Sequence, residues 1–138
     1  MHIDGMLTMI DYDKFIVNTF MDGAVNVFEL SARTDGTIEA SFLTKDWGKV
    51  LSKALNTTVQ MIPCGGGDMI QGMWEMWNLG SNVLTIAPGE VVSYDRSWVT
   101  LELLDKAGIT VHTFGGSELS RGFGGPRCMS MPIVREKI

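Results

Sequence analysis

Apolar side chains recur at helical spacing between Thr44 and Asn56. The apolar positions fall at i, i+3, i+4, i+7 and i+8, and they are Trp47, Val50, Leu51, Ala54 and Leu55. Lysines occupy the opposite side of the same stretch. This pattern predicts an amphipathic helix, with Thr44 as its N-cap and Asn56 closing its C-terminus.

The next segment changes from strand-like to helical composition. Thr58 to Pro63 is rich in β-branched residues and predicts a strand that enters the Gly65-Gly66-Gly67 turn. Asp68 to Trp77 is then expected to form a short helix or an irregular segment.

A hairpin, a helix and a strand follow. Asn82 to Ala87 and Val91 to Tyr94 are short apolar stretches on either side of Pro88-Gly89, where Pro presets φ and Gly accepts a positive φ, so they predict a β-hairpin. Ser97 to Ala107 returns to helical spacing, and Ile109 to Phe114 predicts a strand. The apolar stripe expected on that helix is Val99, Leu103 and Ala107, with Gly108 just beyond its end.

The order strand, strand, helix, strand also occurs in the first half of the chain. There, Met6 to Ala32 contains the expected strands, and the first helix and the strand at Thr58 follow. The two halves form a weak internal repeat of about 50 residues. We therefore expect an α/β protein with two ββαβ-like modules, at 1–64 and 82–114, a connecting segment at 65–81, and a loop and terminal strand at 115–138.

Composition narrows the classes of protein to consider. With 138 residues, 45% hydrophobic and 20% charged, the chain has the size and apolar content of one globular domain. A net charge of -5 without any Lys/Arg block argues against a nucleic-acid partner. No apolar stretch is long enough for a membrane span and no secretory signal is recognisable, so we expect a cytoplasmic protein with Cys64 and Cys128 as free thiols.

The Cys and His residues give no sign of a metal site. No spacing brings two of them together as ligands, so we expect neither a metal nor a cofactor. Ten Met and four Trp are a heavy apolar load for this length, and they either fill a core or form a face that contacts a neighbour.

Two segments carry residues suited to catalysis. Glycines crowd the chain just before Cys128, and such a loop lets the backbone approach a ligand closely, although an ordinary surface turn has the same composition. At the other end, His2 and Asp4 share a face if the segment is extended. A His beside a carboxylate suits a general acid working with a thiolate, although such a pair is more often a solvated surface feature.

Several segments resemble the arginine deiminases in order and separation. Residues 124–132, Gly-Gly-Pro-Arg-Cys-Met-Ser-Met-Pro, resemble the nucleophile loop of that family, and residues 1–4, Met-His-Ile-Asp, resemble its catalytic Met-His-Leu-Asp strand. Further similar stretches lie at 62–68, 77–82, 86–89 and 116–121. The resemblance spans nearly the whole chain and covers about the C-terminal third of the family's length.

The resemblance implies a partial pentein-type α/β propeller, in which ββαβ modules surround a pseudo-fivefold axis with the active site at the centre. It implies that Cys128 attacks the guanidinium carbon of L-arginine, that His2 helps ammonia leave, and that water resolves the amidino-thioether to citrulline. By the same resemblance Asp4 holds the guanidinium nitrogens, and Gly125 and Arg127 belong to the substrate-binding loop.

The chain also departs from the family. It lacks the catalytic Glu, the second guanidinium-binding Asp and the N-terminal residues that bind the substrate's carboxylate, so we expect it to be inactive without an N-terminal partner chain. A partial ring leaves apolar surfaces bare, which predicts an oligomer. Phe123 stands where some members carry an Arg. Two alternatives therefore stay open: a non-catalytic oligomeric remnant or guanidino-binding module, and a relative that hydrolyses dimethylarginine or transfers amidino groups.

Other conspicuous residues have simpler interpretations. Cys64 is expected to be a buried structural thiol rather than a second nucleophile. His112 alternates within an apolar strand, which is typical of a packed or edge histidine. Trp74 and Trp77, three residues apart, are expected to be packing residues.

Overall fold

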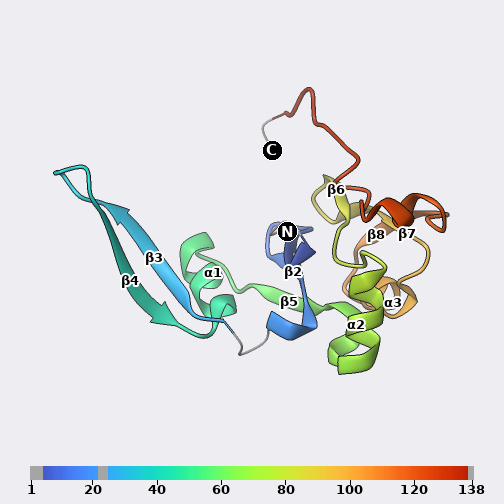
Figure 1. Cartoon of the computed structure of the whole chain (residues 1–138), viewed down its shortest axis with the longest axis horizontal. Helices are drawn as coiled ribbons and strands as arrows, with labels where there is room; N and C mark the ends of the chain where they lie inside the picture. The colour runs from blue at the N-terminus through green and yellow to red at the C-terminus, as the bar shows by residue number, and fades with distance from the viewer. Residues whose placement is uncertain (1–4, 22–24, 137–138) are drawn as a thin grey trace.

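The computed structural model describes residues 5–21 and 25–136 and shows a mixed α/β protein with small sheets (Figure 1). The helices of the described part are α1 (Trp47–Leu55), α2 (Met69–Trp77) and α3 (Trp98–Lys106). The strands are β1 (Leu7–Met9), β2 (Lys14–Val17), β3 (Val27–Ala32), β4 (Ile38–Thr44), β5 (Gln60–Pro63), β6 (Leu84–Ala87), β7 (Glu90–Tyr94) and β8 (Thr110–Phe114). The described residues also include the short 3-10 turns η2 (Thr19–Met21), η3 (Cys64–Gly67) and η4 (Leu119–Gly122).

Two three-stranded sheets share one topology. In the first, β1 pairs antiparallel with β2, which pairs parallel with β5. In the second, β6 pairs antiparallel with β7, which pairs parallel with β8. A helix precedes the third strand in both cases, α1 before β5 and α3 before β8. The strand order therefore agrees with the internal repeat that the sequence predicts.

A long hairpin between β2 and α1 is the main element that the sequence analysis missed. The strand β4 was not predicted, and β3 and β4 pair antiparallel to form an arm that projects from the body (Figure 1). The register places Phe28 opposite Phe42, Leu30 opposite Ala40 and Ala32 opposite Ile38. Opposed residues share a face of a sheet. One face of this arm is therefore entirely apolar, and we call it the arm face.

The two three-stranded sheets meet along β1 and β6. Thr8 donates its hydroxyl to the carbonyl oxygen of Ser81 at 2.8 Å, and Thr85 donates to that of Met9 at 2.8 Å. The amide of Gly89 in the β6–β7 turn donates to the carbonyl oxygen of Ile10 at 2.9 Å. One core lies beneath these contacts and draws residues from both sheets: Ile10, Ile16, Ile62, Cys64, Val83, Val91, Leu104 and Ile109.

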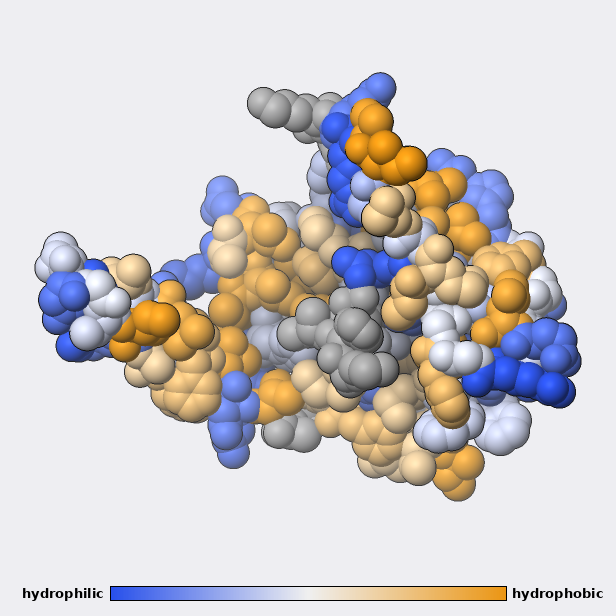
Figure 2. Space-filling view, turned by 45° about the horizontal axis from the view of Figure 1, so that its top comes forward, coloured by the Kyte–Doolittle hydropathy of each residue, from blue (hydrophilic) through white to orange (hydrophobic). Residues whose placement is uncertain are grey.

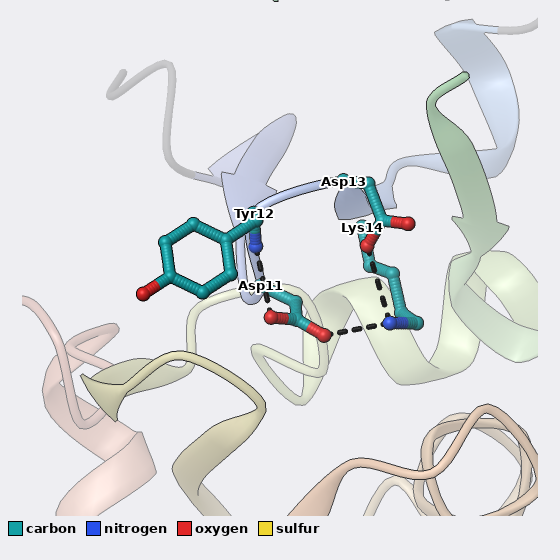
Figure 3. Close-up of polar contacts among 4 residues, drawn as sticks. All are labelled: Asp11, Tyr12, Asp13 and Lys14. Atoms are coloured by element: carbon teal, nitrogen blue, oxygen red, sulfur yellow. Dashed lines mark hydrogen bonds and ion pairs between the residues drawn. The ribbon is translucent and has the colours of Figure 1, made fainter. Parts of the chain in front are cut away.

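The β1–β2 turn is closed by ionic contacts at this junction. The ammonium of Lys14 lies 2.6 Å from Asp11 and 3.2 Å from Asp13, and Asp11 also accepts the amide hydrogen of Tyr12 (Figure 3). The hydrogen bond from Lys14 lowers the pKa of Asp11 below its ordinary value. The carboxylate of Asp11 is therefore charged at neutral pH, and it lies in the turn that faces the β6–β7 hairpin.

The first helix begins two residues later than its sequence predicts. Asp46, not Thr44, is the N-cap of α1, and its carboxylate accepts the amide of Lys49 at 3.1 Å. Thr44 is the last residue of β4, so it is still in the sheet when the chain turns. Asn56 ends the helix with a left-handed φ of 51°, as predicted.

A buried carboxylate joins α2 to α3. Glu75 is fully buried and accepts the amides of Val99 and Thr100 at 2.8 and 2.9 Å, as well as the hydroxyl of Thr100. Ser97, which precedes α3, makes no side-chain capping bond. Glu75 thus supplies the acceptor oxygens for amides that would otherwise be unpaired at the start of α3.

The apolar stripe of α2 points away from this core. Its four members occur at helical spacing, yet all four are exposed, whereas Gly72 and Glu75 are buried. The stripe consists of Ile70, Met73, Trp74 and Trp77, which are 81%, 52%, 60% and 67% exposed. Trp74 and Trp77 are therefore not part of the core, because the buried face of α2 carries Glu75, although the ring of Trp77 does pack against that of Phe123.

A terminal strand was also expected within 115–138, and none forms in the described residues 115–136. The chain after Ser130 leaves the body instead, and Ile133 and Val134 are 88% and 82% exposed. Apolar residues without a neighbouring strand lack the ladder bonds that would hold them in a sheet.

Leu79 offers a test of the backbone in the turn after α2, because its φ of 65° is left-handed. Both Leu79→Gly and Leu79→Ala remove the side chain, but only glycine adopts this φ without steric cost. We expect the glycine variant to be more stable than the alanine variant by about 1 kcal/mol in urea unfolding. Alanine equal to or above glycine would show that the turn is not left-handed.

Candidate functional site

The loop that carries Cys128 is anchored from β7. Tyr94, 1% exposed, donates its hydroxyl to the carbonyl oxygen of Gly124 at 2.8 Å. Gly116 lies against the same ring, and a Cβ there would be 2.3 Å from the aromatic carbon Cδ1. Tyr94 therefore holds the loop at both its start and its centre, and this requires glycine at position 116.

Cys128 is exposed and is contacted by one buried amide. The Nδ2 group of Asn82 donates to Sγ of Cys128 at 3.0 Å, and Oδ1 accepts the amide hydrogen of Cys128 at 3.3 Å. Asn82 is only 3% exposed and lies just before β6. The thiol of Cys128 is therefore exposed at the surface, whereas the side chain of Asn82 that contacts it is buried.

Gly125 and Arg127 lie on either side of this contact. Gly125 is buried, and a Cβ there would be 2.3 Å from Oδ1 of Asn82, so only glycine allows the loop to come this close. Arg127 is exposed, and its carbonyl oxygen accepts the amide of Ser130 at 3.1 Å and the hydroxyl of Ser130 at 2.8 Å. These bonds close the turn around the cysteine.

The predicted residues His2 and Asp4 lie outside the described residues. The described chain starts at Gly5, whose carbonyl oxygen accepts the hydroxyl of Ser81 at 2.8 Å. Ser81 precedes Asn82, which contacts Cys128. Two neighbouring residues of the second half therefore touch the beginning of the described chain and the thiol loop.

Sequence reasoning missed Asn82, Ser81 and Tyr94 as parts of this site. Asn82 and Ser81 fall inside the 77–82 segment singled out above, but nothing in that segment indicates which side chain reaches the cysteine. Tyr94 occupies an ordinary position near the end of a strand. Their roles depend on contacts between segments at least 30 residues apart, which local patterns do not encode.

A pocket with a volume of about 590 Å³ lies next to the loop. Its aromatic wall includes Trp77 and Phe123, whose rings meet edge to face with centroids 5.3 Å apart. Arg96 and Arg121 lie at its rim, and Arg121 pairs with Glu118 at 3.2 Å. The pocket is therefore bordered by both aromatic and cationic groups.

The other thiol is buried, as predicted. Cys64 is 0% exposed, and its burial raises the pKa of the thiol to about 11, despite a hydrogen bond from Thr100. A raised pKa keeps the thiol protonated at neutral pH. Cys64 is therefore a structural group and not a second nucleophile.

His112 lies at the edge of the second sheet, in agreement with one of its predicted roles. It is exposed on β8, and its Nε2 lies 2.7 Å from Oε1 of Glu90. Among the described residues, no group of three His, Cys, Asp or Glu side chains is placed to hold a metal ion. None of the helices in 5–21 and 25–136 has the length and apolar character that crossing a membrane requires.

An exposed cysteine on a glycine-rich loop, held by a buried amide, defines a candidate cysteine nucleophile on an α/β scaffold. The sequence profile described as arginine deiminase matches residues 1–135. The chain therefore belongs to the arginine deiminase family.

Individual relatives agree with this assignment. The chain is 51% identical over 142 residues to the arginine deiminase of Lactococcus lactis subsp. cremoris, and 45% identical over 140 residues to that of Clostridium perfringens. It is 45% identical over 139 residues to the arginine deiminase of Mycoplasma capricolum. Each alignment covers 100% of this chain and 34% of the relative. The chain thus spans about a third of the length of these relatives.

The contrast between the two thiols gives a direct test of the site. At pH 8 a thiol with a pKa of about 11 is thiolate in only about one molecule in a thousand, and Cys64 is also inaccessible. We expect iodoacetamide to label Cys128 at least ~100-fold faster than Cys64 in the folded chain, measured by peptide mass spectrometry. In 8 M urea the two rates should converge. Equal rates in native buffer would contradict the burial of Cys64.

Proposed function

We propose that this chain is the nucleophile-bearing C-terminal part of an arginine deiminase-type hydrolase, which converts L-arginine to citrulline and ammonia. One observation carries the proposal: within a chain matched to the family over residues 1–135, Cys128 is exposed on a loop that buried groups hold in place. A nucleophile must be both accessible and fixed in direction.

The chemistry proceeds in two displacements. Sγ of Cys128 bonds to the guanidinium carbon, one carbon–nitrogen bond breaks, and the nitrogen leaves as ammonia after His2 donates a proton. Water then adds to the amidino-thioether carbon, the carbon–sulfur bond breaks, and the thiolate and citrulline are released. His2 acts as the base for that water, which restores its proton.

Asp4, Gly125 and Arg127 bind the substrate in this proposal. A carboxylate matches the planar guanidinium with two parallel hydrogen bonds, which suits Asp4. The bond from Ser81 to the carbonyl oxygen of Gly5 supports a short distance between this segment and the thiol, because Asp4 precedes Gly5 and Asn82 follows Ser81.

The proposed scaffold is a partial pentein-type propeller. Residues 1–64 and 82–114 would be two modules of a pseudo-fivefold ring, residues 65–81 the connection, and 115–138 the nucleophile loop and chain end. The identical strand order and direction of the two three-stranded sheets support this division. In this scheme the β3–β4 arm is an insertion in the first module.

Activity requires a partner chain in this proposal. The relatives are about three times as long as the matched region, since the alignments cover 34% of them. The catalytic Glu and second Asp would come from an N-terminal polypeptide of the same family, and the pair would act in the cytoplasm. In this proposal, residues 1–138 do not themselves supply the groups that would orient the substrate.

A second candidate is a non-catalytic guanidino-binding module. It is favoured by Phe123, which lies beside the pocket and packs against Trp77, where an Arg would be able to bind a substrate carboxylate. An aromatic ring offers a cation a π face but gives a carboxylate no ionic partner. This candidate predicts guanidinium binding without turnover in any combination of chains.

Turnover with and without a partner separates the two candidates. The partner to add is the N-terminal two thirds of the L. lactis arginine deiminase, expressed as a separate polypeptide. We expect citrulline formation from L-arginine only in the mixture, and a loss of at least ~1,000-fold on Cys128→Ser, because the hydroxyl is a much weaker nucleophile than a thiolate. Cys64→Ser is the matched control and should keep activity. No citrulline in a mixture that forms a stable complex would leave the binding module as the better account.

Exposed apolar surfaces support association of the chain. Figure 2 shows apolar residues gathered on the projecting arm and, at the top of the view, along the C-terminal segment. The exposed members are Phe28, Leu30, Ile38 and Phe42 on the arm, and Met131, Ile133 and Val134 on the segment. Surfaces of this kind on a soluble chain favour contact with a second molecule, and we propose a homo-oligomer in the absence of the N-terminal partner.

A charge placed on either side of the arm tests this association. Leu30 belongs to the arm face, whereas Ser31 points to the opposite side. We expect Leu30→Lys to weaken self-association at least ~10-fold, because burial of an unpaired ammonium is costly, and Ser31→Lys to leave it within ~2-fold. Light scattering after size exclusion at micromolar concentrations measures both. A monomeric unmodified chain would remove the oligomer from the proposal.

A further inference from the structure

The side chain that contacts Cys128 has no part in the reaction proposed above. Asn82 touches both the sulfur and the backbone amide of the cysteine, at 3.0 and 3.3 Å. We propose that Asn82 is a positioning residue that fixes the Cys128 side chain and favours its thiolate over its thiol. This inference rests on the proposed role of Cys128 as nucleophile.

The direction of the Asn82 carboxamide follows from its partners. The backbone amide of Cys128 can only donate a hydrogen bond, so the group that faces it must be Oδ1. That leaves Nδ2, which can only donate, facing the sulfur. A sulfur that receives an N–H is acting as an acceptor, and the thiolate is a far better acceptor than the thiol. The geometry therefore places a hydrogen-bond donor where a thiolate would accept it better than a thiol.

Asn82 is held too rigidly to turn away. It is 3% exposed, its own amide donates to the carbonyl oxygen of Leu79 at 3.0 Å, and Ser81 before it is bonded to Gly5 and Thr8. On the loop side, Gly125 packs directly on the carboxamide. A rigid donor stabilises a charge without the cost of reorganising when the charge appears.

Tyr94 supports the loop without competing for this role. Its hydroxyl donates to the carbonyl oxygen of Gly124, and burial, together with the nearby charge of Cys128, raises the pKa of the phenol. The phenol thus stays protonated and keeps donating over the pH range in which a thiol titrates. Tyr94 sets where the loop lies, whereas Asn82 acts on the sulfur itself.

A purely structural contact would have the same geometry, and replacement of Asn82 by aspartate and by serine together distinguishes the two roles. Asn82→Asp keeps the acceptor for the Cys128 amide and almost the same shape. It replaces the donor that faces the sulfur with a negative oxygen, which repels the thiolate. This added charge opposes the thiolate whatever the role of Asn82. The neutral variant Asn82→Ser removes the donor without adding a charge, so a purely structural contact predicts an unchanged pH profile of labelling and a thiolate-selective donor predicts an upward shift.

The experiment follows alkylation of Cys128 by iodoacetamide in the chain alone, between pH 5.5 and 9, with peptide mass spectrometry as readout. Cys64 stays protonated and buried over this range. We expect Asn82→Asp to shift the pH profile of labelling upward by about one unit or more and to slow labelling at pH 7 about 10-fold. Asn26→Asp adds the same charge at an exposed position before β3 and should match the unmodified chain.

The fold of each variant is checked by thermal unfolding. Asn82→Ser is the deciding variant, because its hydroxyl is too short to make both contacts and it adds no charge; we again expect an upward shift of the labelling profile. A folded variant with the profile of the unmodified chain would overturn the role of Asn82. An upward shift without citrulline formation in the mixture of the two polypeptides would contradict only the enzyme proposal. The failure of the role of Asn82 and the failure of the proposed function are therefore distinguishable.

Discussion

The burial of one shared core between two very small sheets is the constraint on which the rest of the structure depends. Three strands of three to five residues cannot bury enough apolar surface to be stable by themselves. Ile10 and Ile16 from the first sheet therefore pack with Val83 and Val91 from the second. This packing fixes the distance between the start of the described chain and the loop of Cys128.

Polar groups inside this junction set its geometry. Thr8, Ser81 and Asn82 are all buried, and each is hydrogen bonded across a chain separation of at least 46 residues. Unpaired polar groups at such depth would destabilise the fold, so each must be satisfied by its particular partner. The same requirement that orders the junction also orients the amide at the thiol. The same contacts therefore stabilise the fold and fix the position of the Asn82 side chain beside Cys128.

The sequence predicts the regular elements well because their signals are local. The hairpin around Gly89, the helix that ends at Asn56 and the strand order of both halves follow from apolar spacing and turn chemistry. The Glu75 cap and the Asn82 contact could not be predicted in this way, since both join segments that are distant in the chain. The exposure of Trp74 was missed for a related reason. Helical periodicity shows that a stripe exists, but only the position of Glu75 decides which face of α2 points inward.

The β3–β4 arm shows how residues can be inserted into such a chain without disturbing its core. Its two ends, Val27 and Thr44, are paired neighbours, so the chain leaves and re-enters the body at nearly the same place. An excursion of this kind adds little to the entropy of closing the loop between β2 and α1. Homologous proteins can therefore lengthen, shorten or lose the hairpin over evolutionary time while the pairing of β2 with β5 persists.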